Sequence, residues 1–353
     1  MSRAPTISVI MPAFNAAHYM EVSLPPLIRL RDRGEVSEVI VVDDCSTNPS
    51  NIETARRLGA SIMSTAANGG PGAARNIAAK SAVGELIWFV DADVVAHETG
   101  PEKIRNTFKD PTVTAVFGSY DDKPPAENFA SQYKNLVHRY YHQRGSADAS
   151  TFWAGCGAIR RSSFLAIGGF DQRNYQRPAI EDIELGHRLR EAGERIRLIH
   201  DLLGTHLKNW RLAEVIRTDI FQRAIPWSRL ILSSPRKNND LNLSYMEKVR
   251  AVIALTWAAS LIALPAAFFD PLFGIAFSVM TGVMLIANWS LLGYFTARHG
   301  PLFAAAGLVF HQIYYLYSTA SYAYCVGERA LKKPVRAPES VAQKASSSTR
   351  LPE

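Results

Sequence analysis

Cysteine is scarce in this sequence. Only three cysteines, Cys45, Cys156 and Cys325, occur in 353 residues, and no two of them have the CxxC spacing. Disulfide-stapled secreted proteins carry many cysteines in a short chain, and structural zinc sites place cysteine or histidine ligands at short intervals. The sequence therefore predicts neither a disulfide framework nor a zinc site, and it favours a reducing compartment.

The start of the chain also lacks the pattern of a secretory signal peptide. Residues Met1–Thr6 contain no basic region followed by a long apolar stretch, and the apolar run Ile7–Met11 leads directly into Pro12. A signal peptide needs both a basic region and a longer apolar core. We expect the N-terminal domain to remain in the cytosol.

An excess of basic residues is missing from the first part of the chain. Residues 1–210 hold 24 Lys and Arg against 24 Asp and Glu, whereas residues 211–353 hold 15 against 8, which is the whole net charge of +7. A nucleic-acid-binding protein would be expected to carry its basic patch on the folded domain. Here the excess flanks apolar segments, which favours attraction to an anionic membrane surface and argues against a nucleic-acid partner.

Strand-like and helix-like patterns alternate through the first half. This alternation indicates βαβ units and a mostly parallel sheet, with ligands expected beyond the carboxyl ends of the strands. The expected strands are Ile7–Met11, Val39–Val42, Ser61–Met63, Glu85–Val90 and Val113–Phe117. The expected helices are Ala16–Arg33 (broken at Pro25-Pro26), Asn51–Leu58, Pro71–Ala82, Pro101–Phe108, Asn128–His142 and Ile180–Ala192.

Residues 211–250 form a basic juxtamembrane region in this interpretation. Within it, Leu212–Ile225 is amphipathic, with apolar residues on one face and Arg217 and Arg223 elsewhere. Such a helix either packs on the surface of the domain or lies at a membrane interface. The apolar segments that follow favour the interface.

Three apolar segments make residues 251–327 a predicted transmembrane region. They cover about 251–269, 272–296 and 302–326, and each is long enough for a hydrocarbon core of about 30 Å. His311 and Gln312 interrupt the third segment and are costly in lipid unless they are paired, so we expect hydrogen bonds between helices there.

The orientation of these segments is ambiguous. Three spans would put the C-terminus opposite the catalytic domain, yet Arg329, Lys332, Lys333 and Arg336 follow the third segment, and positive charge prefers the cytoplasmic side. Either one of the three segments is re-entrant or interfacial, or the basic residues of the tail do not determine the orientation. Residues 328–353 are polar and are predicted to be disordered.

Asp91-Ala92-Asp93 is the triplet that points to chemistry. It follows the buried strand Glu85–Val90 directly. Mg²⁺ and Mn²⁺ are usually held by one or two carboxylates together with substrate phosphates. The triplet therefore suggests a metal-bound diphosphate substrate, although such a short pattern on its own is more often a solvated loop.

The triplet belongs to an ordered set of motifs, which resembles the family 2 inverting glycosyltransferases of the GT-A fold over about residues 6–235. The resemblance implies a Rossmann-like α/β domain over residues 1–210, with a mostly parallel mixed sheet flanked by helices. The motifs are Val9–Asn15, Val41–Ser46, Asn68–Asn76, Asp91-Ala92-Asp93 and Glu181-Asp182.

For several of these motifs the residue types by themselves suggest both a ligand contact and a purely structural alternative. Asp43 or Asp44 offers acceptors to a nucleobase or ribose, or instead caps a turn. The glycine-rich turn before Pro71 exposes backbone N–H groups to an anion, or is a plain loop. Arg75 lies one turn into the following helix, where it would reach the base or diphosphate unless it is simply solvated.

The resemblance also implies a metal and a general base. Mn²⁺ or Mg²⁺ would be held by Asp93 with Asp91, and His206 is a candidate third ligand, although a lone histidine is more often structural. Asp182 is the expected base, with Glu181 as the fallback, because inverting transfer needs a carboxylate opposite the leaving group. An acidic pair at a helix start is otherwise a common dipole interaction.

Two further residue sets complete the predicted site. The nucleotide-sugar donor, linked to UDP or GDP, would contact Pro12, Ala13, Phe14, Asp43, Asp44, Gly72, Arg75 and Asp91. The acceptor would contact Trp153, Gly155 and Cys156, although Trp153 is also a reasonable core residue.

The expected function is transfer of a single sugar, with inversion, to an acceptor hydroxyl, on a lipid or a lipid-linked glycan. The chain would be a multi-pass protein of the inner or plasma membrane with its catalytic domain in the cytoplasm. Gln222–Trp227 departs from the Q-x-x-R-W spacing of processive synthases, which argues against polymer extrusion. The alternatives are a polyprenyl-phosphate glycosyltransferase and a catalytically inactive membrane scaffold.

Overall fold

The computed structural model describes residues 3–233 and 244–331. Its sheet has the order β3-β2-β1-β4-β8-β6-β9-β5, with β7 paired to β9. The predicted alternation of strands and helices is confirmed, and each predicted strand is present. The strands are β1 (Ile7–Ala13), β2 (Glu38–Asp43), β3 (Ser61–Ser64), β4 (Leu86–Val90), β5 (Val94–Ala96), β6 (Val113–Tyr120), β7 (Asp148–Ala149), β8 (Cys156–Arg160) and β9 (Arg195–His206).

The sheet is mixed, and six of its nine strands run in the same direction, namely β3, β2, β1, β4, β6 and β9, so the expectation of a mostly parallel mixed sheet is confirmed. Strands β3, β2, β1 and β4 are parallel, as is the pair β6 and β9. The other pairings, β4 with β8, β8 with β6, and β9 with β5 and β7, are antiparallel. The sequence did not identify β5, β7 and β8 as the strands of opposite direction, because a fully buried strand has the same apolar pattern in either direction.

Helices cover both faces of this sheet. One core cluster packs under α1 (Ala17–Asp32) and α4 (Gly100–Phe108), and a second packs under α3 (Gly70–Ser81) and α7 (Glu181–Glu191). The predicted break at Pro25-Pro26 is wrong, because α1 is continuous and packs Leu24, Pro26 and Leu27 into the core, which offsets the lost backbone hydrogen bonds. Two shorter helices are α2 (Ser50–Arg57) and α6 (Arg161–Ala166).

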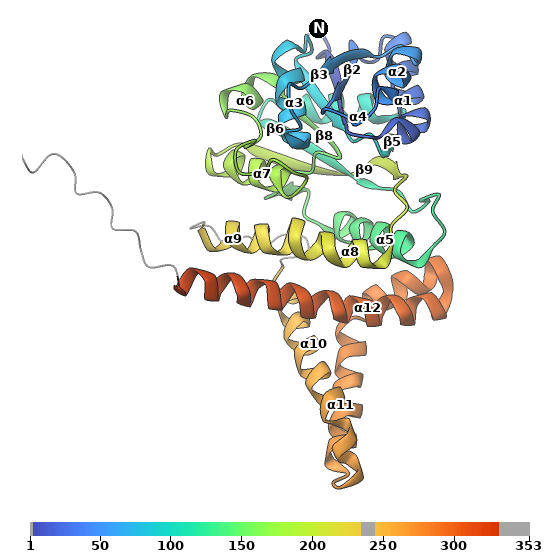
Figure 1. Ribbon diagram of the computed structural model, residues 1–353, viewed down its shortest axis with the longest axis vertical. Coiled ribbons are helices and arrows are strands. Elements are labelled where there is room, and N and C mark those ends of the chain that lie inside the picture. Colours follow the sequence, from blue (N-terminus) through green and yellow to red (C-terminus); the bar gives the residue numbers. More distant parts are fainter. Residues whose placement is uncertain (1–2, 234–243, 332–353) are drawn as a thin grey trace, which may run out of the picture.

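A second layer of helices lies below the sheet (Figure 1). It contains α5 (Phe129–Arg144), α8 (Leu212–Thr218), the π-helical segment η1 (Asp219–Ala224) and α9 (Ile225–Ser233). The amphipathic segment predicted at Leu212–Ile225 therefore covers α8, η1 and the first residue of α9. A third core cluster joins α8 to α5 and to the C-terminal helix α12 (Trp289–Leu331) through Tyr133, Val215, Phe295 and Phe310.

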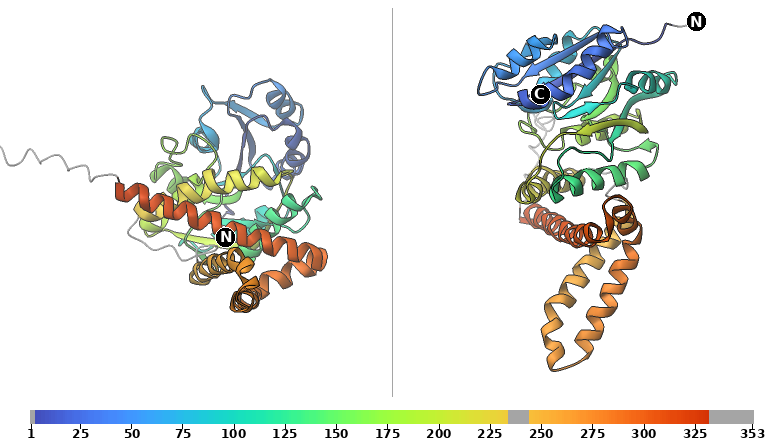
Figure 2. Two further views of the ribbon diagram at one scale, coloured as in Figure 1. Left: turned by 60° about the horizontal axis from the view of Figure 1, so that its bottom comes forward. Right: turned by 90° about the vertical axis from the view of Figure 1, so that its right-hand side faces the viewer.

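The helices α10 (Tyr245–Ala263) and α11 (Leu272–Ala287) form a hairpin that projects away from the domain (Figures 1 and 2). A short 3₁₀ segment, Leu264–Phe268, extends α10 to the tip. In the described part of the chain, Tyr245–Phe268 is the single helix that is by itself long and apolar enough to cross a membrane. A second span results only if α11 and α12, which meet at 70°, are counted as one.

The third predicted segment is not, within the described residues, a separate helix that is by itself long and apolar enough to cross a membrane. Residues 302–326 lie within α12, which runs across the base of the hairpin and contacts α5, η1 and α9 (Figure 1). His311 and Gln312 are fully buried there. His311 is hydrogen-bonded through Nδ1 to the Tyr133 hydroxyl at 2.7 Å and through Nε2 to the Tyr141 hydroxyl at 3.1 Å, as expected for hydrogen bonds between helices.

The C-terminal end of α12 lies beside α9, where Arg329 donates a hydrogen bond to the Leu232 carbonyl oxygen. The predicted disordered tail is wrong at its start, since residues 328–331 belong to α12. The remainder, residues 332–353, lies outside the described residues, as do Lys332, Lys333 and Arg336.

Candidate active site

Asp93 and His206 form a close pair at one edge of the sheet. Asp93 lies in the turn between β4 and β5, and His206 ends β9, which is antiparallel to β5 at this point. Asp93 Oδ2 is 3.5 Å from His206 Nε2. The imidazole stacks on the ring of Tyr120, with centroids 4.4 Å apart, so its orientation is fixed.

The chemistry of this pair fits a hard divalent cation. Burial acts to raise the pKa of Asp93, but the hydrogen bond and charge of His206 bring that pKa below its usual range, so the carboxylate is ionised. In the described ranges, no three His, Cys, Asp or Glu side chains converge on one point. Two protein ligands leave room for substrate phosphates, as is usual for Mg²⁺.

Arg75 connects this edge to the acidic pair on α7. It is buried, donates to Asp91 Oδ1 at 2.5 Å and to Glu181 Oε1 at 3.3 Å, and lies 5.3 Å from the ring centroid of Phe170. Two of its three guanidinium nitrogens are thus paired with carboxylates, and the expected contact of Arg75 with the base or diphosphate stays a prediction. Burial raises the pKa of Asp91 above its usual range, and Arg75 partly opposes that rise.

Asp182 lies at the start of α7, and both Asp182 and Asp91 are hydrogen-bonded to the backbone of Ala154-Gly155. Asp182 Oδ2 accepts a hydrogen bond from Ala154 N at 3.1 Å, and the next residue, Gly155, accepts one from Asp91 N at 3.2 Å. Burial, followed by the charge of Glu181, raises the pKa of Asp182 to about 7. A carboxyl group with that pKa is suited to general-base catalysis near neutral pH.

Glu181 has a structural role, because both of its carboxylate oxygens have partners within the protein. Its Oε1 pairs with Arg75, and its Oε2 accepts a hydrogen bond from Ala179 N at 2.9 Å. The side chain is buried. Of the two acidic residues, Asp182 is therefore the one suited to proton transfer.

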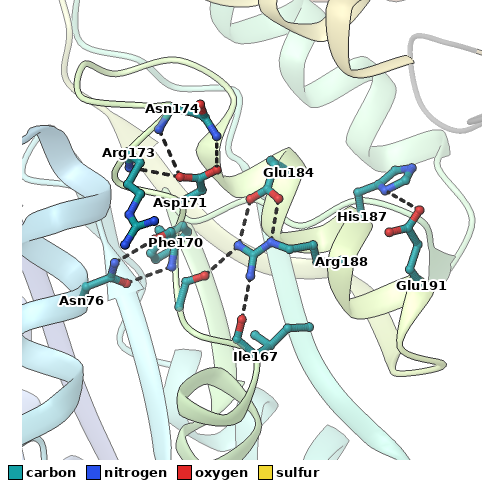
Figure 3. A network of polar contacts seen from close by, with 11 residues as sticks. Asn76, Ile167, Phe170, Asp171, Arg173, Asn174, Glu184, His187, Arg188 and Glu191 are labelled. Atoms are coloured by element: carbon teal, nitrogen blue, oxygen red, sulfur yellow. Dashed lines mark hydrogen bonds and ion pairs between the residues drawn. The ribbon is translucent and has the colours of Figure 1, made fainter. Parts of the chain in front are cut away.

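A polar network fixes α7 against α3 (Figure 3). Arg188 of α7 pairs with Glu184 and donates to the carbonyls of Ile167 and Gly169 at 2.8 and 2.7 Å. Asn76 of α3 exchanges two hydrogen bonds with the backbone of Phe170. Because Phe170 also packs on Arg75, this network sets the position of α7, which carries Asp182, relative to the edge of the sheet that carries Asp93 and His206 (below, the metal edge).

The glycine-rich turn before α3 binds an internal carboxylate. Asp44 accepts hydrogen bonds from Gly69 N at 3.1 Å, Gly70 N at 2.8 Å and Thr65 Oγ1 at 2.8 Å. The N–H groups of Gly69 and Gly70 are therefore engaged by Asp44, and binding of a substrate anion by the rest of the turn stays a prediction. Gly70 is required in this turn, since its φ is +81° and a Cβ would lie 2.8 Å from the Gln176 carbonyl oxygen.

Asp43 and Gly72, two more of the residues assigned to the donor, also face inward. Asp43 accepts hydrogen bonds from Asn51 Nδ2 at 3.0 Å and Ser46 N at 3.2 Å. A Cβ on Gly72 would lie 3.1 Å from Phe170 and 3.6 Å from Glu181, so Gly72 permits close packing of α3 on α7. Pro12 and Ala13 are buried in β1, whereas the following Phe14 is exposed.

The residues assigned to the acceptor divide into two groups. Cys156 is fully buried in β8 opposite Val90, which contradicts a direct acceptor contact. Trp153 packs edge-on against Tyr120, and Gly155 makes room for the Trp153 ring, because a Cβ there would lie 2.5 Å from it.

Sequence reasoning missed the histidine next to Trp153. His138 of α5 packs against Tyr120, Trp153 and His142, with ring centroids 4.3, 4.6 and 3.9 Å apart. Its buried Nδ1 has no hydrogen-bond partner among the described residues. No motif in the sequence marks His138, because α5 joins the site only through tertiary packing.

Comparison with known proteins agrees with this geometry. Residues 8–168 match the family model for glycosyl transferase family 2. A pre-mycofactocin glycosyltransferase from Mycobacterium tuberculosis is 28% identical over 220 residues, which are 58% of this chain and 44% of that protein. The poly(ribitol-phosphate) β-N-acetylglucosaminyltransferase TarS of Staphylococcus aureus is 40% identical over 90 residues, which are 24% and 16% of the two chains. The chain thus spans less than half the length of these relatives.

One solved structure has the same fold over almost the whole chain. The mannosyltransferase PcManGT from Pyrobaculum calidifontis, solved in complex with GDP-Man and Mn²⁺, superposes with a TM-score of 0.58 and 19% identity. The match covers 92% of this chain and 88% of that one. The fold is thus GT-A-like, with a mixed sheet flanked by helices, and the chain carries a glycosyl transferase family 2 domain over residues 8–168.

Proposed function

We propose that this protein transfers a single sugar, with inversion, from a nucleotide-diphosphate sugar to an acceptor hydroxyl on a lipid or lipid-linked glycan. The observation that carries the proposal is the link between the metal edge and the base. Arg75 joins Asp91 to Glu181, and the adjacent residues Ala154 and Gly155 contact Asp182 and Asp91.

The protein groups have separate tasks in this proposal. Asp93 and His206 would hold Mn²⁺ or Mg²⁺, which neutralises charge on the departing nucleoside diphosphate. Asp182 accepts the proton of the acceptor hydroxyl as the new bond forms, and Glu181 holds Arg75 in place. Tyr120 keeps the His206 ring in a fixed plane.

Membrane attachment is the second part of the proposal, and the α10–α11 hairpin supports it. Its surface carries exposed apolar side chains, and at the tip Phe268 and Phe269 are 95% and 94% exposed. The 24 residues Tyr245–Phe268 would extend about 36 Å as a helix, against a hydrocarbon core of about 30 Å. A hairpin of this kind keeps the catalytic domain and α12 on one side of the bilayer.

Transfer to a polyprenyl phosphate is the second candidate, because Lys208, two residues after His206, has no ion-pair partner in the described part of the chain. Such an acceptor is already an anion and would not need Asp182. The retained carboxylates Asp91, Asp93 and Asp182 argue against an inactive scaffold.

The test is a panel of UDP- and GDP-sugars given to the full-length protein in detergent, with Mn²⁺ or Mg²⁺ and a lipid extract as acceptor. Mass spectrometry of the product identifies the donor sugar, the acceptor and the newly formed bond. Metal-dependent consumption of one donor is expected. If no donor is consumed in any combination, the proposed function is wrong.

A further inference from the structure

We propose that His138, together with Tyr120 and Trp153, forms a hydrogen-bonding subsite for an uncharged hydroxyl group of the acceptor, and that His138 is a specificity-determining residue of this subsite. The proposal rests on the function proposed above and names the chemical class of the acceptor group, which is a hydroxyl of a sugar or polyol and not a phosphate. Tyr120 ends β6, His138 lies on α5 and Trp153 precedes β8, so tertiary packing alone brings them together.

The three aromatic rings contact one another. The centroid of the His138 ring is 4.3 Å from that of Tyr120 and 4.6 Å from that of Trp153. The Tyr120 and Trp153 rings are 4.9 Å apart and nearly perpendicular. All three side chains are half-buried, whereas the neighbouring rings of Phe117 and Phe152 are fully buried. The cluster therefore borders the core and is accessible to a ligand on its other side.

This cluster lies between the metal edge and the expected base. Tyr120 stacks on His206, with centroids 4.4 Å apart and planes 13° from parallel. Trp153 is followed directly by Ala154, whose N–H donates to Asp182. The cluster is thus joined by direct contacts to the proposed metal ligand on one side and to the residue that binds the base on the other.

His138 lies on the side of Tyr120 away from the metal edge. The centroids of His138 and His206 are both within 4.4 Å of the Tyr120 centroid. In the described part of the chain the two imidazoles make no ring contact with each other, so they lie on different sides of the phenol ring. In the proposed function the diphosphate of the donor binds at the metal edge, which leaves the side of His138 to the acceptor.

The polar atoms of this cluster have no partners. Within residues 3–233 and 244–331, the Tyr120 hydroxyl, Trp153 Nε1 and both ring nitrogens of His138 make no hydrogen bond. His138 Nδ1 is buried, whereas the other three atoms are accessible. A phenylalanine would pack equally well at position 138 if the imidazole served only the fold. Because polar atoms at this depth usually have partners, the accessible ones are suited to a ligand.

An uncharged hydroxyl is the group that these atoms suit. Burial lowers the pKa of His138 well below its usual range and raises the pKa of Tyr120 well above its own, so every side chain of the cluster is neutral at pH 7. A neutral imidazole offers one donor and one acceptor, as a hydroxyl does. Lys134, one turn earlier on α5, is paired with Asp219, so the cluster offers no free cation to a phosphate. Aromatic walls with a few polar groups are common in ligand sites.

The experiment uses the full-length protein in nanodiscs and the variants His138→Phe and His138→Gln, with His299→Phe as the matched control. Phenylalanine keeps a ring and removes both nitrogens, and glutamine keeps an amide that can bind a hydroxyl. His299 is exposed on α12. Saturation-transfer NMR measures binding of the methyl glycosides of glucose, galactose, mannose and N-acetylglucosamine, with inorganic phosphate as the competitor. Calorimetry measures binding of UDP and GDP with Mn²⁺.

His138→Phe should weaken binding of the preferred glycoside by about three- to tenfold, as expected for loss of one neutral hydrogen bond. His138→Gln should recover most of this loss, and His299→Phe should have no effect. Nucleotide affinity should be the same in all four proteins, and phosphate should not displace the glycoside.

The subsite is wrong if the unmodified protein binds none of the glycosides, if phosphate displaces them, or if His138→Phe binds them as tightly as the unmodified protein. An equal loss of nucleotide affinity in His138→Phe, or an equal loss of glycoside affinity in His299→Phe, would also overturn it, because the effect would then not be specific to the acceptor. If the unmodified protein binds a glycoside but binds neither nucleotide and consumes no sugar donor, the proposed function fails and the subsite stands.

Discussion

His206 Nε2 lies 3.5 Å from Asp93 Oδ2, although the two residues are more than a hundred positions apart in the chain. The pairing of β5 with β9 brings them together, since Val94 and His206 are direct partners in the ladder. Each side chain is thus positioned by a strand end and not by a mobile loop.

The first prediction concerns this pair. Asp93→Asn should reduce kcat/KM by at least about 100-fold, because charge on the departing diphosphate would lose its main counterion. The loss should be partly recovered at higher Mn²⁺ concentration, and EDTA should abolish turnover of the unmodified protein. Steady-state kinetics over a range of Mn²⁺ concentrations measures both effects.

Asp201→Asn is the matched control, because Asp201 is an exposed carboxylate whose ion pair among the described residues is with Lys103. It should leave kcat/KM unchanged. Undiminished turnover in EDTA would contradict a metal-dependent reaction.

The second prediction concerns Asp182. Asp182→Asn should abolish transfer while the affinity for the nucleotide stays about the same, because the amide keeps the hydrogen bond from Ala154 N but cannot accept a proton. In the unmodified protein the transfer rate should rise with pH up to about 7, the pKa to which burial and Glu181 raise this carboxyl group. A pH–rate profile measures this limb. Transfer that persists in the variant would place the base elsewhere or indicate a phosphate acceptor.

The same carboxyl group gives a control that is independent of activity. Its folded pKa lies above the unfolded value of about 3.9, so the folded state binds this proton more tightly. The contribution of Asp182 to the free energy of unfolding is therefore greatest below about pH 4 and is lost as the pH rises to about 7. In Asp182→Asn the free energy of unfolding should not show this decrease between about pH 4 and pH 7, which thermal unfolding over that pH range measures.

The third prediction concerns Asp44. Asp44→Ala should lower the free energy of unfolding by about 1–3 kcal/mol, because Gly69 N, Gly70 N and Thr65 Oγ1 would lose their common acceptor. Denaturant unfolding measures the change. Asp44→Asn should cost less, since one acceptor oxygen remains. A variant with normal stability and lost nucleotide binding would show that Asp44 serves the donor after all.

The fourth prediction concerns the contact between α5 and α12. His311→Phe should destabilise the protein by about 1–3 kcal/mol, because the hydroxyls of Tyr133 and Tyr141 would lose a buried partner. Thermal unfolding in detergent measures the shift. His299→Phe makes the same change at an exposed position of α12 and should have little effect. Equal effects of the two variants would contradict a specific role for His311.

The fifth prediction concerns the hairpin. If α10 and α11 cross the bilayer, a cysteine at Asp270, between the two helices, should react with a membrane-impermeant maleimide applied from outside the cell. A cysteine at Arg229 on α9 should react only after the membrane is permeabilised. The three native cysteines are replaced by serine in both proteins. Protection of position 270 from both sides would mean that the hairpin enters the bilayer without crossing it.

Much of the fold could be predicted because its signals are local. The strands around Val39–Val42 and Glu85–Val90 are short apolar runs that end in polar residues, and the structure has strands at both places. Asp91 and Asp93 follow such a strand, so their place at the edge of the sheet was also accessible from the sequence. Strand direction was not, since β8 is apolar for the same reason whether it runs parallel or antiparallel to β4.

The roles of the charged residues depended on neighbours that are distant in the chain. A sequence motif marks Arg75 and Asp44 as polar residues near a turn, but it does not show that Arg75 meets Glu181 or that Asp44 meets Gly70. These partners satisfy the charges internally, because a buried charge is stable only when it is paired. The third apolar segment differs for a similar reason, since Tyr133 and Tyr141 supply the hydrogen bonds that His311 would lack in lipid.

The sequence by itself determined the alternation of strands and helices, the acidic residues at their ends and the apolar character of the hairpin. These depend on residue type and spacing along one stretch of chain. The tertiary structure alone decided which carboxylates remain available for chemistry, where His206 lies, and on which side of the hairpin α12 packs. Each of those depends on contacts between segments far apart in sequence, where burial and pairing fix the state of a side chain.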